Sequence, residues 1–86
     1  MADEKKTRIS VNIYGKTYTI VGSEKSGHVQ QVASIVDEKM RQLRDRNPAL
    51  DTASVAILTA VNMTNDYIKL QQDYEQLEEQ LKKEKD

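Results

Sequence analysis

The chain has 86 residues, a mass of 9.8 kDa and no cysteine, so it holds one small domain that no disulfide or cysteine-ligated metal can stabilise. A chain of this size buries only about 60–65% of its unfolded surface, and with 37% hydrophobic residues it favours self-association over a self-sufficient monomeric enzyme. The net charge of −1 lacks the large basic excess that is usual in nucleic-acid-binding proteins.

A β-hairpin is predicted near the start of the chain, with strands at residues 8–14 and 16–21. In the first strand, aliphatic residues alternate with other residues, which is the period of a strand buried on one face: Ile9, Val11 and Ile13. Gly15 lies between the strands and tolerates the positive φ of a tight turn. Because a lone two-stranded hairpin is barely stable in water, it must pack on a helix or on a second hairpin.

An amphipathic helix is predicted next, with Ser23 or Ser26 as its N-cap and Arg46 near its end. Its apolar residues recur at spacings of three and four, which places them on one stripe: Val29, Val32, Val36, Met40 and Leu43. We expect the helix to end at Asn47, because a residue that precedes proline avoids the helical conformation.

A long helix is predicted from a cap at Asp51 or Thr52 to Lys85, since no glycine or proline interrupts this stretch. A heptad seam of apolar residues specifies a left-handed coiled coil: Ala56, Ala60, Met63, Tyr67, Leu70, Tyr74, Leu77 and Leu81. A second apolar set widens the face only in the first half of the helix: Ile57, Leu58, Val61 and Ile68.

These patterns imply different neighbours for the two halves of the long helix. We expect residues 53–68 to pack on the hairpin and first helix on one side and on a partner helix on another, whereas residues 69–85 need only a partner helix. No second long helix is predicted in this chain, so the partner is another copy. The prediction is an α+β fold of order β-β-α-α in an obligate homo-oligomer, with a disordered tail (1–7), a globular head (8–50) and a long helix with a C-terminal coiled coil (51–86).

Candidate catalytic groups are few. His28, the only histidine, is favoured as an exposed surface residue over a general base or metal ligand. The serines have no base at a suggestive spacing, and the three glycines are scattered rather than gathered in a phosphate-binding loop. The adjacent Asp37 and Glu38 are expected to be solvated surface, since neighbours on a helix point in different directions. We therefore expect no enzyme, no catalytic residue, no cofactor, no metal and no small-molecule substrate.

Positive charge gathers in the N-terminal half, because residues 1–46 carry nine basic and six acidic side chains and residues 47–86 carry four and eight. Part of it lies at the end of the first helix: Lys39, Arg41, Arg44 and Arg46. These residues can dock an acidic partner or compensate the helix dipole, and composition alone favours the dipole. Tyr14 and Tyr18, which flank the hairpin turn, are expected to serve packing rather than an exposed contact.

Three segments, and above all the order of the elements, resemble the ZapA family of Z-ring-associated bacterial cell-division proteins. The segments are Val11 to Ile20, Val29 to Leu43 and Val55 to Met63, and the resemblance covers residues 8–82. It implies a non-enzymatic protein of the cytoplasm and the mid-cell division site, which binds the tubulin-like GTPase FtsZ and crosslinks its protofilaments during septation. It also implies homodimers that can pair, through antiparallel coiled coils, into tetramers.

The resemblance assigns candidate FtsZ-binding residues position by position. Lys16 matches a basic residue after the hairpin glycine, and Arg44 and Arg46 match basic residues at the end of the first helix. Ala53 stands where the family has a charged residue at the start of its long helix. Because FtsZ is acidic, docking becomes the favoured interpretation of the basic group.

One alternative function is a small dimeric nucleic-acid-binding protein of ribbon-helix-helix type, which also has a strand followed by two helices. The net charge, the two-stranded hairpin and the acidic C-terminal half argue against it. No apolar run approaches the roughly 20 residues of a membrane span, and no apolar stretch of a signal peptide follows the first residues. We therefore expect no membrane insertion and a cytoplasmic protein.

Overall fold

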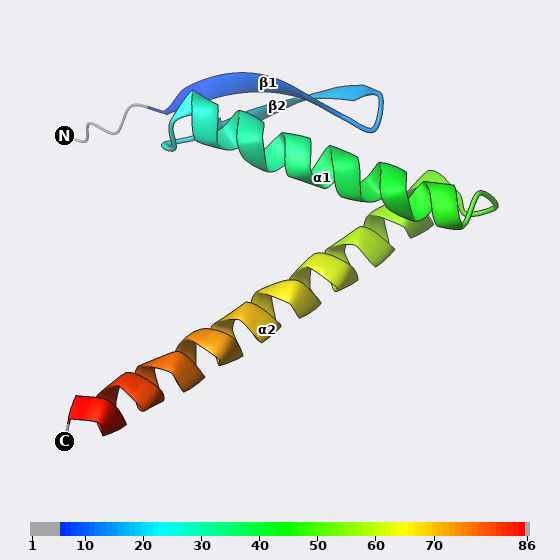
Figure 1. The fold of residues 1–86 in the computed structure, drawn as a ribbon. Coiled ribbons are helices and arrows are strands. Elements are labelled where there is room, and N and C mark those ends of the chain that lie inside the picture. Colours follow the sequence, from blue (N-terminus) through cyan, green and yellow to red (C-terminus); the bar gives the residue numbers. More distant parts are fainter. Residues whose placement is uncertain (1–5, 86) are drawn as a thin grey trace.

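The computed structural model describes residues 6–85 and has the predicted α+β order. Its elements are β1 (Thr7–Ile13), β2 (Lys16–Gly22), α1 (Ser26–Arg46) and α2 (Thr52–Lys85), as Figure 1 shows. The hairpin lies along α1, and α2 leaves the far end of α1 at an angle, so that the molecule has the shape of a V. Of the tail predicted for residues 1–7, residues 1–5 lie outside the described part of the chain, and β1 already begins at Thr7.

The hairpin turn consists of two residues with positive φ, Tyr14 at 54° and Gly15 at 84°. Two successive left-handed residues match the right-handed twist of the flanking strands. Gly15 adopts this conformation at no steric cost, whereas a tyrosine there costs about 1–2 kcal/mol. Other contacts must therefore hold Tyr14 in place, and Thr17 braces the turn by donating a hydrogen bond of 2.8 Å to the Asn12 side chain.

Helix α1 covers one side of the hairpin. Ile9 and Val11 of β1 pack on Val29 and Ala33 of α1 in the first core cluster. Tyr18 of β2 is the antiparallel partner of Val11 in the register, yet 48% of its surface is exposed. The face of β2 that carries Tyr18 is therefore only partly covered in the single chain.

The two helices begin differently from one another. The N-cap of α1 is Lys25, which makes no side-chain capping bond, so the predicted caps Ser23 and Ser26 are wrong. Ser26 is the first helical residue, where its hydroxyl no longer occupies the capping position. For α2 the expected cap is confirmed, because the backbone N–H of Ser54 donates a hydrogen bond of 2.8 Å to Asp51 Oδ1.

A second core cluster joins the helices at the vertex of the V. Met40 and Leu43 of α1 enclose Val55 of α2, whose side chain is fully buried. One turn later Thr59 is also buried, and its hydroxyl donates a hydrogen bond of 2.8 Å to the carbonyl of Val55. The expected packing of residues 53–68 on the hairpin and first helix is thus met only near these two residues, because the two helices diverge from the vertex.

Candidate functional site

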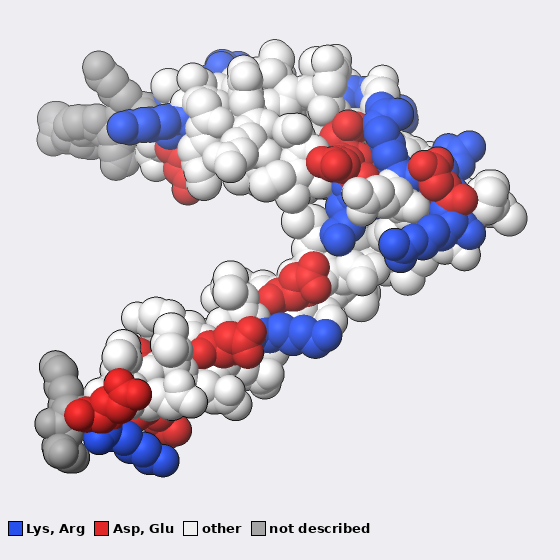
Figure 2. Space-filling view, in the orientation of Figure 1, with Lys and Arg blue, Asp and Glu red and all other residues white. Residues whose placement is uncertain are grey.

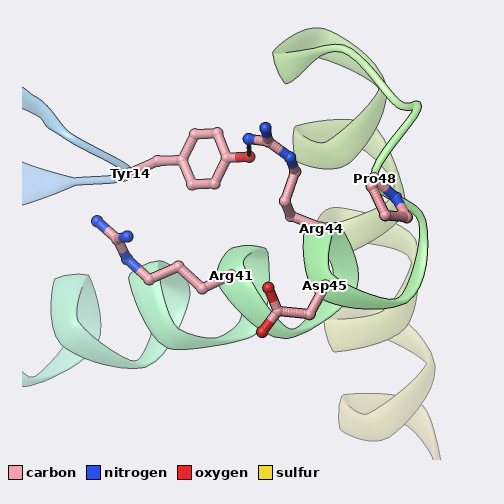
Figure 3. Close-up of a pocket in the computed structure, with 5 residues that line it drawn as sticks. All are labelled: Tyr14, Arg41, Arg44, Asp45 and Pro48. Atoms are coloured by element: carbon pink, nitrogen blue, oxygen red, sulfur yellow. Dashed lines mark hydrogen bonds between the residues drawn. The ribbon is translucent and has the colours of Figure 1, made fainter.

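The hairpin turn and the C-terminal part of α1 meet at Tyr14. Its backbone N–H donates a hydrogen bond of 2.6 Å to Asp37 Oδ1, and its hydroxyl accepts one of 2.7 Å from Arg44 Nη1. Asp37 and Arg44 lie two turns apart on α1, so the two bonds tie Tyr14 to two turns of the helix. Figure 3 shows the bond between Tyr14 and Arg44. The tyrosine is half-buried and packs against the second core cluster, so the expected packing role is met for Tyr14. It is not met for Tyr18, which is 48% exposed in the single chain.

Asp37 fixes the hairpin turn from the helix side. Besides the bond from Tyr14, its two carboxylate oxygens accept hydrogen bonds of 3.2 and 3.1 Å from Arg41 Nε, one turn further along α1. The bond from the Tyr14 backbone, followed by the bond from Arg41, holds the pKa of Asp37 below its ordinary value. Its side chain is 28% exposed, so the expectation that Asp37 is merely solvated surface is wrong.

Two guanidinium groups approach the Tyr14 ring. The central carbon of Arg41 lies 5.9 Å from the ring centroid, within cation–π range. Arg44 reaches the hydroxyl, and this hydrogen bond raises the pKa of Arg44, which keeps its charge at every physiological pH. A hollow, the Tyr14 pocket, lies among five side chains that Figure 3 shows: Tyr14, Arg41, Arg44, Asp45 and Pro48.

The structure brings two of the three predicted FtsZ-binding residues next to Tyr14. Lys16 is the exposed first residue of β2 and lines a second hollow with Tyr14, while Arg44 donates a hydrogen bond to the Tyr14 hydroxyl. Arg46 is exposed in the last turn of α1, but residues two apart on a helix do not share a face. Figure 2 shows Lys and Arg side chains gathered where the hairpin turn, the end of α1 and the start of α2 meet, with acidic groups among them.

The predicted seam of α2 is uncovered in the single chain. Met63 is half-buried, and Ala56 and Ala60 are exposed. The larger seam residues that follow each expose between 56 and 68% of their surface: Tyr67, Leu70, Tyr74, Leu77 and Leu81. The second apolar set is exposed as well, from 37% for Leu58 to 64% for Ile57. A continuous apolar face of this length is typical of an interaction surface.

His28 Nε2 lies 3.3 Å from Glu24 Oε1, and both side chains are more than half exposed, as expected for a surface residue. Within residues 6–85, no three His, Asp or Glu side chains are grouped so as to hold a metal ion. Over the same residues, neither helix combines the length and the apolar character that crossing a membrane requires.

Sequence reasoning missed Asp37 and the polar role of Tyr14. The spacing of four between Asp37 and Arg41 is a recognisable helical ion pair, and it was the available local signal. The bond between Tyr14 and Asp37 joins residues 23 positions apart, and no local pattern encodes such a contact.

Comparison with known proteins gives one consistent result. The family model described as "Cell division protein ZapA" matches residues 9–86. "Cell division protein ZapA" of Geobacillus sp. (strain WCH70) is 55% identical over 86 residues, which is 100% of this chain and 99% of the relative. The protein of the same name from Bacillus velezensis is 54% identical over 82 residues, which is 95% and 96% of the two chains. Among solved structures, "ZapA mutant dimer from Geobacillus stearothermophilus" matches with a TM-score of 0.75 and 48% identity over 95% of each chain.

Proposed function

Because the chain belongs to the ZapA family of cell division proteins, we propose that it binds FtsZ and crosslinks FtsZ protofilaments as a homodimer, which promotes assembly of the Z-ring. As a member of this family the protein is a non-enzymatic cell division protein. Binding to the ring would place it at mid-cell.

The observation that carries the proposal is the exposed seam of α2. One chain has one head and cannot bridge two filaments, whereas two chains joined along the seam present two heads. Large apolar side chains such as Leu70, which is 68% exposed, lose their contact with water when a second copy of α2 covers them. The solved relative from Geobacillus stearothermophilus is described as a mutant dimer, which supports this assembly. Two such dimers, paired through antiparallel tails, would present heads at both ends of a tetramer.

The basic residues of the head supply the proposed contact with FtsZ. Lys16, Arg44 and Arg46 are exposed, and their charge complements an acidic partner. Contacts of this kind are individually weak in water. Two linked heads compensate for weak binding, because the second head is held at a high effective concentration once the first has bound.

Sedimentation of FtsZ filaments with GTP tests the proposal. The chain should increase the amount of FtsZ in the pellet, and the effect should shrink at high salt because exposed charges are screened. Lys16→Glu or Arg46→Glu should weaken bundling without changing the circular dichroism spectrum. Lys25→Glu is the matched control, since it reverses the same charge at the opposite end of α1. Full bundling by both Lys16→Glu and Arg46→Glu would reject these residues as contacts.

The ribbon-helix-helix alternative gains no support from the hairpin. In that fold each chain contributes one strand to a two-stranded ribbon, whereas here β1 and β2 of one chain pair along their whole length. A gel shift with duplex DNA should accordingly detect no salt-sensitive binding.

A further inference from the structure

We propose that the Tyr14 pocket receives a side-chain carboxylate of the filament partner, with the Tyr14 hydroxyl and the Arg44 guanidinium as its hydrogen-bond donors. The inference rests on the proposed binding of FtsZ and specifies the chemistry of the contact. It concerns a surface-exposed Asp or Glu of the partner protein. The walls of the pocket come from the hairpin turn, the end of α1 and the connection to α2 (Figure 3).

The two proposed donors have unused capacity. The phenol oxygen of Tyr14 accepts a hydrogen bond of 2.7 Å from Arg44, which leaves its own proton free for another acceptor. A guanidinium carries five N–H groups in a planar fork, and Arg44 uses one of them in its hydrogen bond to the Tyr14 hydroxyl. Among residues 6–85, no carboxylate lies within ion-pair distance of Arg44. A planar fork held at one arm offers its remaining arms to a carboxylate with little further loss of entropy.

The pocket is held in shape before any partner arrives. Asp37 accepts the backbone N–H of Tyr14 and both contacts from Arg41, so it fixes the hairpin turn and the Arg41 side chain together. Arg41 in turn lies against the Tyr14 ring. Asp37 therefore acts as a positioning residue, and Arg41 adds positive charge beside the hydroxyl. Preorganised donors bind an anion more tightly than donors that must first be ordered.

Asp45 places a negative charge at the edge of the pocket, and this charge allows the sign of the ligand to be tested. It lines the same hollow, and it forms no ion pair within the described part of the chain. Its negative charge repels an incoming carboxylate, whereas it would attract a basic side chain. Removing this charge therefore distinguishes the sign of the ligand, and simple loss of structure cannot produce an increase in affinity.

The test measures the dissociation constant of FtsZ for the immobilised 86-residue chain. Tyr14→Phe removes only the hydroxyl, and Arg44→Lys keeps the charge but removes the planar fork. Each should weaken binding by about tenfold, as expected for a hydrogen bond to a charged group. The matched controls Tyr18→Phe and Arg8→Lys, at exposed residues outside the Tyr14 pocket, should change binding by less than about twofold. Asp45→Asn should tighten binding by about two- to fivefold, and the gain should diminish at high salt.

The outcomes separate this inference from the proposed function. If the unaltered chain does not bind FtsZ, the proposed function fails and the inference fails with it. If FtsZ binds but Tyr14→Phe and Arg44→Lys bind as well as the unaltered chain, the inference is wrong and FtsZ binding stands. Should Tyr14→Phe unfold, Arg44→Lys and Asp45→Asn decide the matter, because both residues are exposed. Unchanged affinity in both, or weaker binding by Asp45→Asn, would overturn the carboxylate site.

Discussion

Truncation of Val55 tests how α2 is attached to the head. Val55 is fully buried between Met40 and Leu43, and Val55→Ala removes two methyl groups from this position. At about 0.8 kcal/mol for each buried group, with a further term for the cavity, the loss is about 2–3 kcal/mol. The better helix propensity of alanine returns about 0.5 kcal/mol. We expect a net loss of about 2 kcal/mol, which lowers Tm by about 8–16 °C.

Thermal and urea unfolding followed by far-UV circular dichroism measure this change, at one fixed protein concentration because the stability of a dimer depends on concentration. Val61→Ala is the matched control: it makes the same change in the same helix, at a side chain that is 60% exposed. In a single chain Val61→Ala should cost nothing, so a loss of stability that is present at high protein concentration and disappears on dilution to the monomer would reveal cover by a second copy. Stability of Val55→Ala within about 0.5 kcal/mol of the unaltered chain would refute the attachment through Val55.

Three further changes probe the turn, the cap and the seam. Hydrogen bonds lower the pKa of Asp37 from 3.8 in the folded state, so its charge stabilises the fold above that value and the contribution is lost as pH falls through the lowered pKa. Asp37→Asn should therefore lose less stability than the unaltered chain in acid unfolding below about pH 4, and parallel curves would contradict this. Asp51→Ala should lower Tm by about 4–8 °C through loss of the α2 cap, while Asp51→Asn, which also caps, should lower it less. Leu70→Asp should shift light scattering towards a monomer by placing a charge in the seam, whereas Gln72→Asp on the outer face should not; two dimeric variants would argue against the seam.

Much of the fold follows from local patterns in the sequence. Alternating residues and Gly15 predict the hairpin, because strand period and turn conformation are properties of neighbouring residues. The α2 cap follows equally from local sequence, since Asp51 lies three residues before Ser54, whose backbone N–H donates a hydrogen bond to the Asp51 carboxylate. The α1 cap was not predictable in this way: two serines had suitable chemistry, and the helix begins after Lys25 instead.

The candidate site was less accessible to sequence reasoning. The sequence shows a group of basic residues near the end of α1. Their neighbours, however, depend on how the hairpin packs on α1. Tyr14 and Asp37 come together only because β1 packs along α1, so that a tertiary contact supports a left-handed tyrosine that local propensity disfavours. The same holds for residues 57–68, whose apolar pattern indicates burial without specifying which chain provides the cover.

The vertex of the V has a mechanical consequence for the reach of the molecule. Val55 joins the core shared with α1 and Thr59 is buried one turn later, and the rest of α2, from Thr59 up to Lys85, extends for about 39 Å. A rotation of about 10° at the vertex would move the far end by about 7 Å over this length. A small repacking of a few methyl groups is thus amplified, as in a lever. Pairing of two α2 helices along their length would restrict this rotation in both chains. The stiffness of the tail would then be a property of the dimer rather than of one chain.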